Sequence, residues 1–208
     1  MSKNKENDLM LPKLSLVLIF FNEEEYIEKC LETIETQTML PDELILVNNN
    51  STDESESIVL NFIDKNKDKL KIIYTNEEKQ GIVPARNRGF SLSKHELIAR
   101  IDADTRLDKD WVKVAKETFS GDYKEKRIAG ISTIPEFYDI NNKAIKGIYQ
   151  FCLNQYFEIC NSIIGEDVLL GSTMIIRKDL LEEIFDKLST DTKSGHEDVE
   201  LSIKLGTV

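Results

Sequence analysis

The chain has 208 residues, of which 40% are hydrophobic and 31% are charged, and its formal net charge is −11 at pH 7. This length supports one sizeable core, so we expect a single domain. The net negative charge argues against DNA, RNA or an anionic bilayer as a partner held by long-range attraction, because that attraction depends on Lys and Arg.

The N-terminal residues, the length of the apolar runs and the cysteines predict the cellular compartment of the protein. Residues 1–13 are polar and lack the apolar segment of a signal peptide, so we expect a disordered tail followed by a folded domain over 14–208. No apolar run is long enough to span a membrane. An odd number of cysteines, Cys30, Cys152 and Cys160, indicates reduced thiols of an intracellular protein. The predicted location is cytoplasmic, with a peripheral position at the inner membrane face as the alternative.

Predicted strands and helices alternate in the first half of the chain. The apolar run from Leu14 to Phe21 is typical of a central parallel strand covered on both faces. A helix is expected from its N-cap Asn22 to about Thr38. The remaining segments are strands at 43–47, 71–74 and 95–101, with helices around 58–63 and over 84–93. This order predicts an α/β fold with a Rossmann-like, open, mostly parallel sheet, whose ligand crevice lies beyond the carboxyl ends of the strands.

The second half is less regular. Its expected elements are a helix at 111–119, an extended segment at 127–132, a long helix at 144–164, a strand at 168–176 and a short helix ending at 205. The long helix carries apolar residues on more than one face. Such helices are normally buried, so buried core is the preferred interpretation. A wall of the acceptor site, a dimer surface and a membrane-facing patch stay open as alternatives.

Three predicted strands end in residues that suit a nucleotide diphosphate. These ends are Phe20-Phe21-Asn22-Glu23, Asn48-Asn49-Asn50-Ser51 and Asp102-Ala103-Asp104. An aromatic ring can cover a base, amides can bind its polar edge, Asp102 can accept from ribose hydroxyls, and Asp104 can hold a divalent metal ion. Taken singly, the phenylalanines also suit a core and the asparagines suit turns. Their joint placement favours a nucleotide pocket.

Charged residues outside the strand ends extend this candidate site. Arg86 stands early in a predicted helix, where its guanidinium could neutralise a diphosphate, whereas we assign Arg88 to the surface. Glu197 and Asp198 open the last helix and are candidates for a general base, although acidic residues at a helix start also stabilise its dipole. His196 is a candidate third metal ligand.

In order and spacing, these residues resemble family 2 glycosyltransferases of the GT-A fold. The resemblance covers about Leu14 to Leu205 and rests on the run from Leu16 to Glu24, on Val47-Asn48-Asn49-Asn50-Ser51-Thr52-Asp53, on Ala85-Arg86-Asn87-Arg88-Gly89, on Asp102-Ala103-Asp104 and on Glu197-Asp198. It implies an inverting glycosyltransferase of the hexosyltransferase type. Such an enzyme moves a sugar from a nucleotide-diphosphate sugar to an acceptor hydroxyl with Mn²⁺ or Mg²⁺. The acceptor, a sugar, a lipid-linked glycan or a protein, stays open.

The resemblance also implies roles for individual residues. It assigns nucleotide binding to Phe20, Phe21, Glu23, Asn48, Asn49, Arg86 and Asp102. It assigns metal binding to Asp104 and Asp102, with His196 as a further candidate. Gly171 and Ser172 match the donor-sugar and acceptor loop, and Asp198 with Glu197 matches the catalytic position. Asn48 stands where the family usually has Asp, so the identity of the base stays open. The chain ends soon after this last helix, and we expect either a short natural form or a chain cut before an acceptor-binding extension.

Two other function classes remain as alternatives. A degenerate nucleotide-sugar-binding or scaffold module would bind a partner protein and perform no transfer. A nucleotidyltransferase would release pyrophosphate from a nucleoside triphosphate, but the chain lacks the Gly-rich phosphate loop that such enzymes tend to need.

Overall fold

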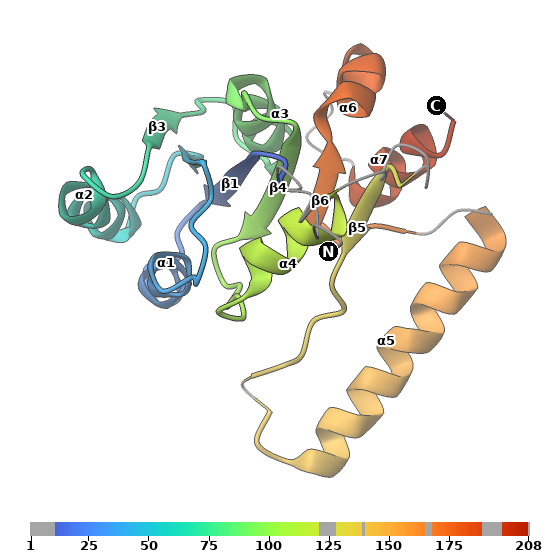
Figure 1. The fold of residues 1–208 in the computed structure, drawn as a ribbon. Helices are drawn as coiled ribbons and strands as arrows, with labels where there is room; N and C mark the ends of the chain where they lie inside the picture. The colour runs from blue at the N-terminus through green and yellow to red at the C-terminus, as the bar shows by residue number, and fades with distance from the viewer. Residues whose placement is uncertain (1–10, 121–127, 139, 165–167, 189–196, 208) are drawn as a thin grey trace, which may run out of the picture.

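The computed structural model describes residues 11–120, 128–138, 140–164, 168–188 and 197–207 (Figure 1). Its strands are β1 Leu14–Phe20, β2 Glu43–Asn48, β3 Ile72–Asn76, β4 Leu97–Asp102, β5 Gly130–Ser132 and β6 Thr173–Arg177. Its helices are α1 Ile27–Glu35, α2 Ser55–Asn66, α3 Ile82–Leu92, α4 Trp111–Thr118, α5 Lys143–Ile164, α6 Lys178–Ile184 and α7 Glu197–Leu205, with one 3₁₀ turn at Phe185–Lys187.

The strands form one six-stranded sheet in the order β3-β2-β1-β4-β6-β5. The pairs among β1 to β4 are parallel, whereas β6 runs antiparallel to both β4 and β5. The predicted α/β class and the mostly parallel sheet are therefore confirmed. From β1 the chain first builds β2 and β3 on one side and then returns to β4 on the other. In such a sheet, ligands bind beyond the carboxyl ends of the two strands where the order reverses.

Helices cover both faces of the sheet, which is why every residue of β1 and β2 is buried. On one face, side chains such as Leu16 and Leu18 pack against α1, α2 and α4. On the other, Val17 and Ile19 belong to a cluster formed with α3, α6 and α7. Because successive strand residues point to opposite faces of the sheet, Arg100 and Asp102 of β4 share one face.

Several predicted boundaries differ from the structure. Asn22 is not the N-cap of α1: it has a φ of 53°, and the helix begins at Ile27 after the carbonyl of Glu23 accepts the N–H groups of Tyr26 and Ile27. The Asn22 side chain instead accepts the N–H of Thr52, in the neighbouring loop. The strand expected at 168–176 begins only at 173.

The expected tail is described only in part. Of residues 1–13, the structure describes 11–13, where Pro12 is buried and the Lys13 N–H donates to Glu96 at 2.8 Å. The described part of the chain therefore begins before β1.

The interpretation of α5 as buried core is wrong. No residue from 143 to 162 is buried, Ile148 and Phe151 are each 64% exposed, and the helix lies apart from the layers that cover the sheet (Figure 1). Residues 133–138 lead the chain away from the sheet edge (Figure 1), so α5 does not lie on the layers that cover the sheet. Among the described helices, none is both long enough and apolar enough to cross a bilayer. The predicted cytoplasmic location stays a prediction.

Candidate active site

A pocket of about 360 Å³ opens at the carboxyl ends of β1, β2 and β4, where the strand order reverses. We call it the crevice pocket. Its lining residues include Phe20, Phe21, Glu23, Asn49, Gly81, Asp102 and Asp104. Phe20 is a buried core residue, whereas Phe21 is 45% exposed. The structure therefore brings most of the residues predicted to bind a nucleotide to one cavity.

The loops that follow β1 and β2 are joined by hydrogen bonds. The Asn49 N–H donates to the Phe20 carbonyl at 2.9 Å, and the Asn22 N–H donates to Ser51 Oγ at 3.1 Å. Asn22 and Asn50 both have positive φ values, 53° and 65°, which asparagine tolerates better than most residues. The asparagine-rich sequence thus serves the tight turns that close one side of the crevice pocket.

The amides of Asn48 and Asn49 are already engaged by the protein. Asn48 donates to the Tyr74 hydroxyl at 3.2 Å and accepts the Ser51 N–H at 2.9 Å. Asn49 donates to two carbonyls of the segment 77–81 and accepts the Gly81 N–H at 2.7 Å. Asn49 lines the crevice pocket, whereas Asn48 is not among its described lining residues. Their predicted contacts with a base stay predictions.

Carboxylates gather at the mouth of the crevice pocket. Burial raises the pKa of Glu23, and the negative charges of Asp104 and Asp102 raise it further. Within the described residues no cluster of three or more metal-ligating side chains is preassembled. Two carboxylates still fit a Mg²⁺ or Mn²⁺ ion, because such ions take one or two protein carboxylates together with phosphate oxygens and water.

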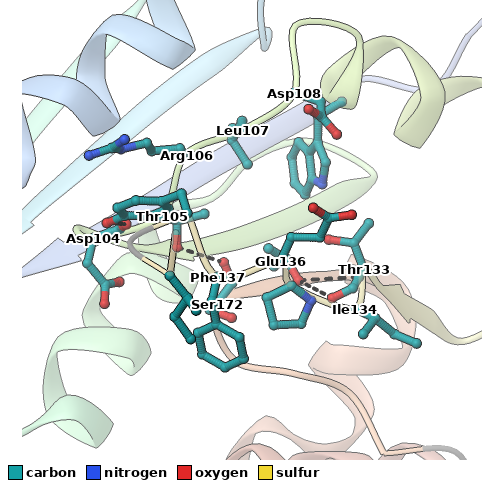
Figure 2. A pocket seen from close by; sticks show the side chains of 15 residues that line it. Asp104, Thr105, Arg106, Leu107, Asp108, Thr133, Ile134, Glu136, Phe137 and Ser172 are labelled. Carbon is teal, nitrogen blue, oxygen red and sulfur yellow. Dashed lines mark hydrogen bonds between the residues drawn. The ribbon is translucent and has the colours of Figure 1, made fainter. Parts of the chain in front are cut away.

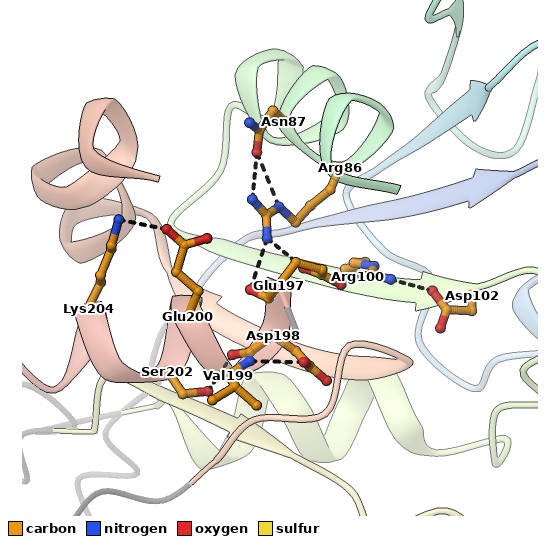
Figure 3. A network of polar contacts seen from close by, with 10 residues as sticks. All are labelled: Arg86, Asn87, Arg100, Asp102, Glu197, Asp198, Val199, Glu200, Ser202 and Lys204. Carbon is orange, nitrogen blue, oxygen red and sulfur yellow. Dashed lines mark hydrogen bonds and ion pairs between the residues drawn. The ribbon is translucent and has the colours of Figure 1, made fainter. Parts of the chain in front are cut away.

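Next to the mouth lies a group of charges, the Arg100 network, in which Arg86, Arg100 and Glu197 are buried and Asp102 is partly exposed (Figure 3). Arg86 Nη1 lies 2.5 Å from one carboxylate oxygen of Glu197, and Arg100 Nη1 donates to the other. Arg100 Nη2 donates to Asp102 Oδ1 at 2.7 Å. Arg86 has no exposed surface, and its Nε and Nη2 donate to Asn87. The diphosphate contact predicted for Arg86 stays a prediction.

Glu197 and Asp198 occupy different surroundings although they are adjacent. Burial alone would raise the pKa of Glu197, but the charges of Arg100 and Arg86 outweigh it and hold that pKa below its usual value. Asp198 is half-buried, and its Oδ1 accepts the Val199 N–H at 2.9 Å. Of the two residues, Asp198 is therefore the more exposed one. His196 lies outside the described residues.

Sequence reasoning missed Arg100. The available signal was a charged residue inside the apolar run of β4, since a buried charge requires a partner.

A second cavity, the side pocket, has a volume of about 620 Å³ and lies between the end of β4 and the segment 133–140 (Figure 2). Its lining includes Asp104, Arg106, Trp111, Glu136, Phe137, Tyr138 and Ser172. The Tyr138 hydroxyl donates to the backbone carbonyl of Asp104 at 2.9 Å, and the Arg106 guanidinium lies 3.6 Å above the Tyr138 ring. Asp104 lines both cavities.

The loop residues Gly171 and Ser172 take different positions. Ser172 lines the side pocket, and its carbonyl accepts from Thr105 Oγ1 at 3.3 Å. Gly171 packs against Arg100, because a Cβ at this position would lie 2.9 Å from Arg100 Nη1. The two residues thus connect the side pocket with the Arg100 network.

Curated relatives of the chain are glycosyltransferases. Glycosyltransferase GlyA of Streptococcus pneumoniae is 32% identical over 100 residues, which is 48% of this chain and 14% of that protein. Glycosyltransferase AglE of Haloferax volcanii is 27% identical over 179 residues, which is 84% of this chain and 55% of that protein. The chain therefore spans about half or less of the length of these relatives.

Solved structures share the fold. A mannosyltransferase from Pyrobaculum calidifontis, in complex with GDP-Man and Mn²⁺, matches with a TM-score of 0.70 and 18% identity over 94% of this chain and 52% of that one. TarS of Staphylococcus aureus in complex with UDP-GlcNAc matches with a TM-score of 0.63 and 18% identity over 93% of this chain and 53% of that one. Both likenesses support the GT-A fold.

The family model described as glycosyl transferase family 2 matches residues 15–185, which contain β1 except for its first residue, all of β2 to β6, and both Asp102 and Asp104. The chain therefore belongs to glycosyl transferase family 2, with the GT-A fold.

Proposed function

We propose that the protein is an inverting glycosyltransferase that moves a sugar from a nucleotide-diphosphate sugar to an acceptor hydroxyl. The observation that carries this proposal is that Asp104 lines both cavities. A donor held in one pocket and an acceptor held in the other would meet at this carboxylate. The relatives are glycosyltransferases by name, and two structural neighbours were solved with nucleotide sugars.

The crevice pocket takes the donor in this proposal. The exposed ring of Phe21 would cover the base, Asp102 would accept from the ribose, and Asp104 would hold the metal ion. Mn²⁺ or Mg²⁺, when bound, supplies positive charge that offsets the charge developing on the leaving diphosphate. Asp102 keeps one oxygen on Arg100, so its other oxygen is the one available to the donor.

The side pocket takes the acceptor in this proposal, and Asp198, which is not among the described lining residues of either cavity, is assigned as the general base from the family resemblance. As the acceptor oxygen forms its bond to the anomeric carbon, the bond from that carbon to the diphosphate oxygen breaks and Asp198 receives the hydroxyl proton. Attack from the face opposite the leaving group inverts the anomeric configuration. The half-buried carboxylate of Asp198 suits this role better than Glu197, whose oxygens are both paired with arginine.

The test begins with calorimetry of the purified protein against uridine and guanosine diphosphate sugars, with and without Mn²⁺. We expect one donor class to bind and the metal to strengthen its binding. That donor is then incubated with acceptor sugars, and nucleotide release and product configuration are measured. Absence of nucleotide binding would contradict the proposal and favour a scaffold. Pyrophosphate release from a nucleoside triphosphate with a sugar phosphate would favour a nucleotidyltransferase.

A further inference from the structure

Arg100 connects two parts of the candidate site that are far apart in the sequence. Its side chain is 1% exposed, and it points to the face of β4 that also carries Asp102, two residues further on. One nitrogen of the guanidinium donates to Asp102, and the other donates to Glu197 at the start of α7 (Figure 3). The planar fork of arginine can make both bonds in fixed directions, which a lysine cannot.

The backbone at Gly171 lies close to the Arg100 guanidinium and limits the space available to it. A Cβ built on Gly171 would lie 2.9 Å from Arg100 Nη1 and 3.3 Å from both Cζ and Nη2. Among the described residues Gly81 is the glycine with a positive φ, so Gly171 is required for space and not for backbone conformation. A methyl group at this position would push the guanidinium from its place without changing any charge.

The start of α7 depends on these contacts. Both carboxylate oxygens of Glu197 are paired with buried guanidinium groups, and the Glu197 carbonyl accepts from Arg86 at 3.1 Å. Removing one partner of a buried ion pair leaves an uncompensated charge, so the carboxylate would have to move toward water. Asp198 is the next residue along the chain and would move with it.

We propose that Arg100 is a positioning residue that fixes the first turn of α7, and with it Asp198, relative to Asp102 in the crevice pocket. Gly171 leaves room for its guanidinium, Arg86 holds the other carboxylate oxygen of Glu197, and Glu197 is the residue through which Arg100 acts. The catalytic meaning of this arrangement rests on the proposed function, whereas the positional claim does not.

The positional claim is tested by amide hydrogen exchange, which requires no activity. We expect Arg100→Lys and Gly171→Ala to speed exchange in α7 by about tenfold or more and to leave α1 unchanged, because local opening is measured separately for each element. Gly147→Ala is the matched control, since a Cβ there meets no atom within 4 Å. Arg88→Lys, on the exposed side of α3, is the control for the arginine. Wild-type exchange in α7 of both test variants, or equally faster exchange in every element, would overturn the proposal.

The catalytic meaning is tested by separating kcat from KM. We expect both variants to lower kcat by up to about 10²-fold, the order of effect that a small misplacement of a catalytic group produces, with donor KM within about threefold of wild type. A wild-type protein that binds no nucleotide sugar would remove the proposed function, and the exchange result would still decide the positional claim. A donor-active wild type whose Gly171→Ala variant keeps full kcat would overturn the catalytic role of Arg100.

Discussion

The side-chain Oδ1 of Asn49 accepts the backbone N–H of Gly81 at 2.7 Å across 32 residues of chain. The Nδ2 of the same amide donates to the carbonyls of Glu77 and Lys79, each at 2.9 Å. Gly81 has a φ of 134°, which L side chains rarely adopt, and it immediately precedes α3. Asn49 thus holds the segment that forms one wall of the crevice pocket.

Asn49→Asp should destabilise the protein and weaken nucleotide binding together. The substitution keeps an acceptor for Gly81 but places a second carboxylate oxygen against the carbonyls of Glu77 and Lys79. We expect the free energy of unfolding to fall by about 1–3 kcal/mol, the cost of leaving buried polar groups unpaired. Urea unfolding and calorimetry measure the two effects. Asn50→Asp is the control, since Asn50 is exposed and donates to one carbonyl, that of Glu78. Wild-type affinity in Asn49→Asp would contradict the role of this loop.

Much of the crevice pocket could be predicted from the sequence. Phe21, Asn49, Asp102 and Asp104 each stand at or just after the end of an apolar strand, and the carboxyl ends of parallel strands meet at one edge of the sheet. The apolar runs also predict a parallel sheet, because a parallel strand that is buried on both faces has a continuous apolar sequence.

Other features could not be predicted because they depend on three-dimensional placement. The apolar faces of α5 indicate that the helix needs cover, but not that the preceding segment carries it away from the sheet. Apart from its neighbour Asn87, the polar partner of Arg86 comes from α7, because Glu197 lies 111 residues further along the chain. No local periodicity reports such a pairing, so a phosphate and a carboxylate were equally compatible with this arginine.

Asp104→Asn should remove the metal-dependent part of nucleotide binding. Asp104 is exposed, so we expect thermal stability close to wild type while Mn²⁺ no longer strengthens binding. Chelation of the metal should reduce wild-type affinity to that of the variant. Asp108→Asn is the control, because Asp108 is exposed and lines the side pocket without lining the crevice pocket. An equal Mn²⁺ response in Asp104→Asn and wild type would contradict the assignment.

Asp198→Asn should lower kcat and leave donor affinity unchanged. Removing a general base typically costs about 10²- to 10⁴-fold in rate, and an amide preserves the size and the acceptor oxygen for the Val199 N–H. Steady-state transfer assays and calorimetry separate the two quantities. Glu200→Gln, in the same helix, removes a 2.7 Å ion pair with Lys204 and should change kcat only a few-fold. Comparable losses in both variants would show that the helix as a whole, and not the base, is disturbed.

Substitutions at Tyr138 should act on the acceptor and not on the donor. Tyr138→Ala removes the ring that lies against Arg106 in the side pocket, and we expect the acceptor KM to rise by about tenfold with donor affinity unchanged. Tyr138→Phe keeps the ring and loses the hydrogen bond to the Asp104 carbonyl, so its effect should be smaller. The comparison requires an identified acceptor and steady-state kinetics. A rise in donor KM alone would place the donor, and not the acceptor, in this pocket.

The buried carboxylate of Glu43 should make stability depend on acid pH. Burial alone would raise its pKa, but hydrogen bonds from Lys71, Ser15 and the Lys94 N–H outweigh burial and hold that pKa below its usual value. In the unfolded chain the ordinary pKa of about 4.5 returns, so the unfolded state binds a proton first as the pH falls. The stabilisation by Glu43 is therefore complete above that value and is lost as the pH drops through the lower, folded-state pKa.

Glu43→Gln should separate this contribution from the remaining acid titration. We expect a loss of about 1–3 kcal/mol near neutral pH, because an amide leaves its buried donors poorly paired, and a shallower decline of the unfolding free energy between about pH 5 and pH 3. Urea unfolding across this range measures both. Glu28→Gln, exposed on α1, is the control and should follow the wild-type curve. Parallel pH curves for Glu43→Gln and wild type would contradict this prediction. They would mean that the Glu43 carboxyl has the same pKa in the folded and unfolded states, although three donors stabilise its charged form in the folded state.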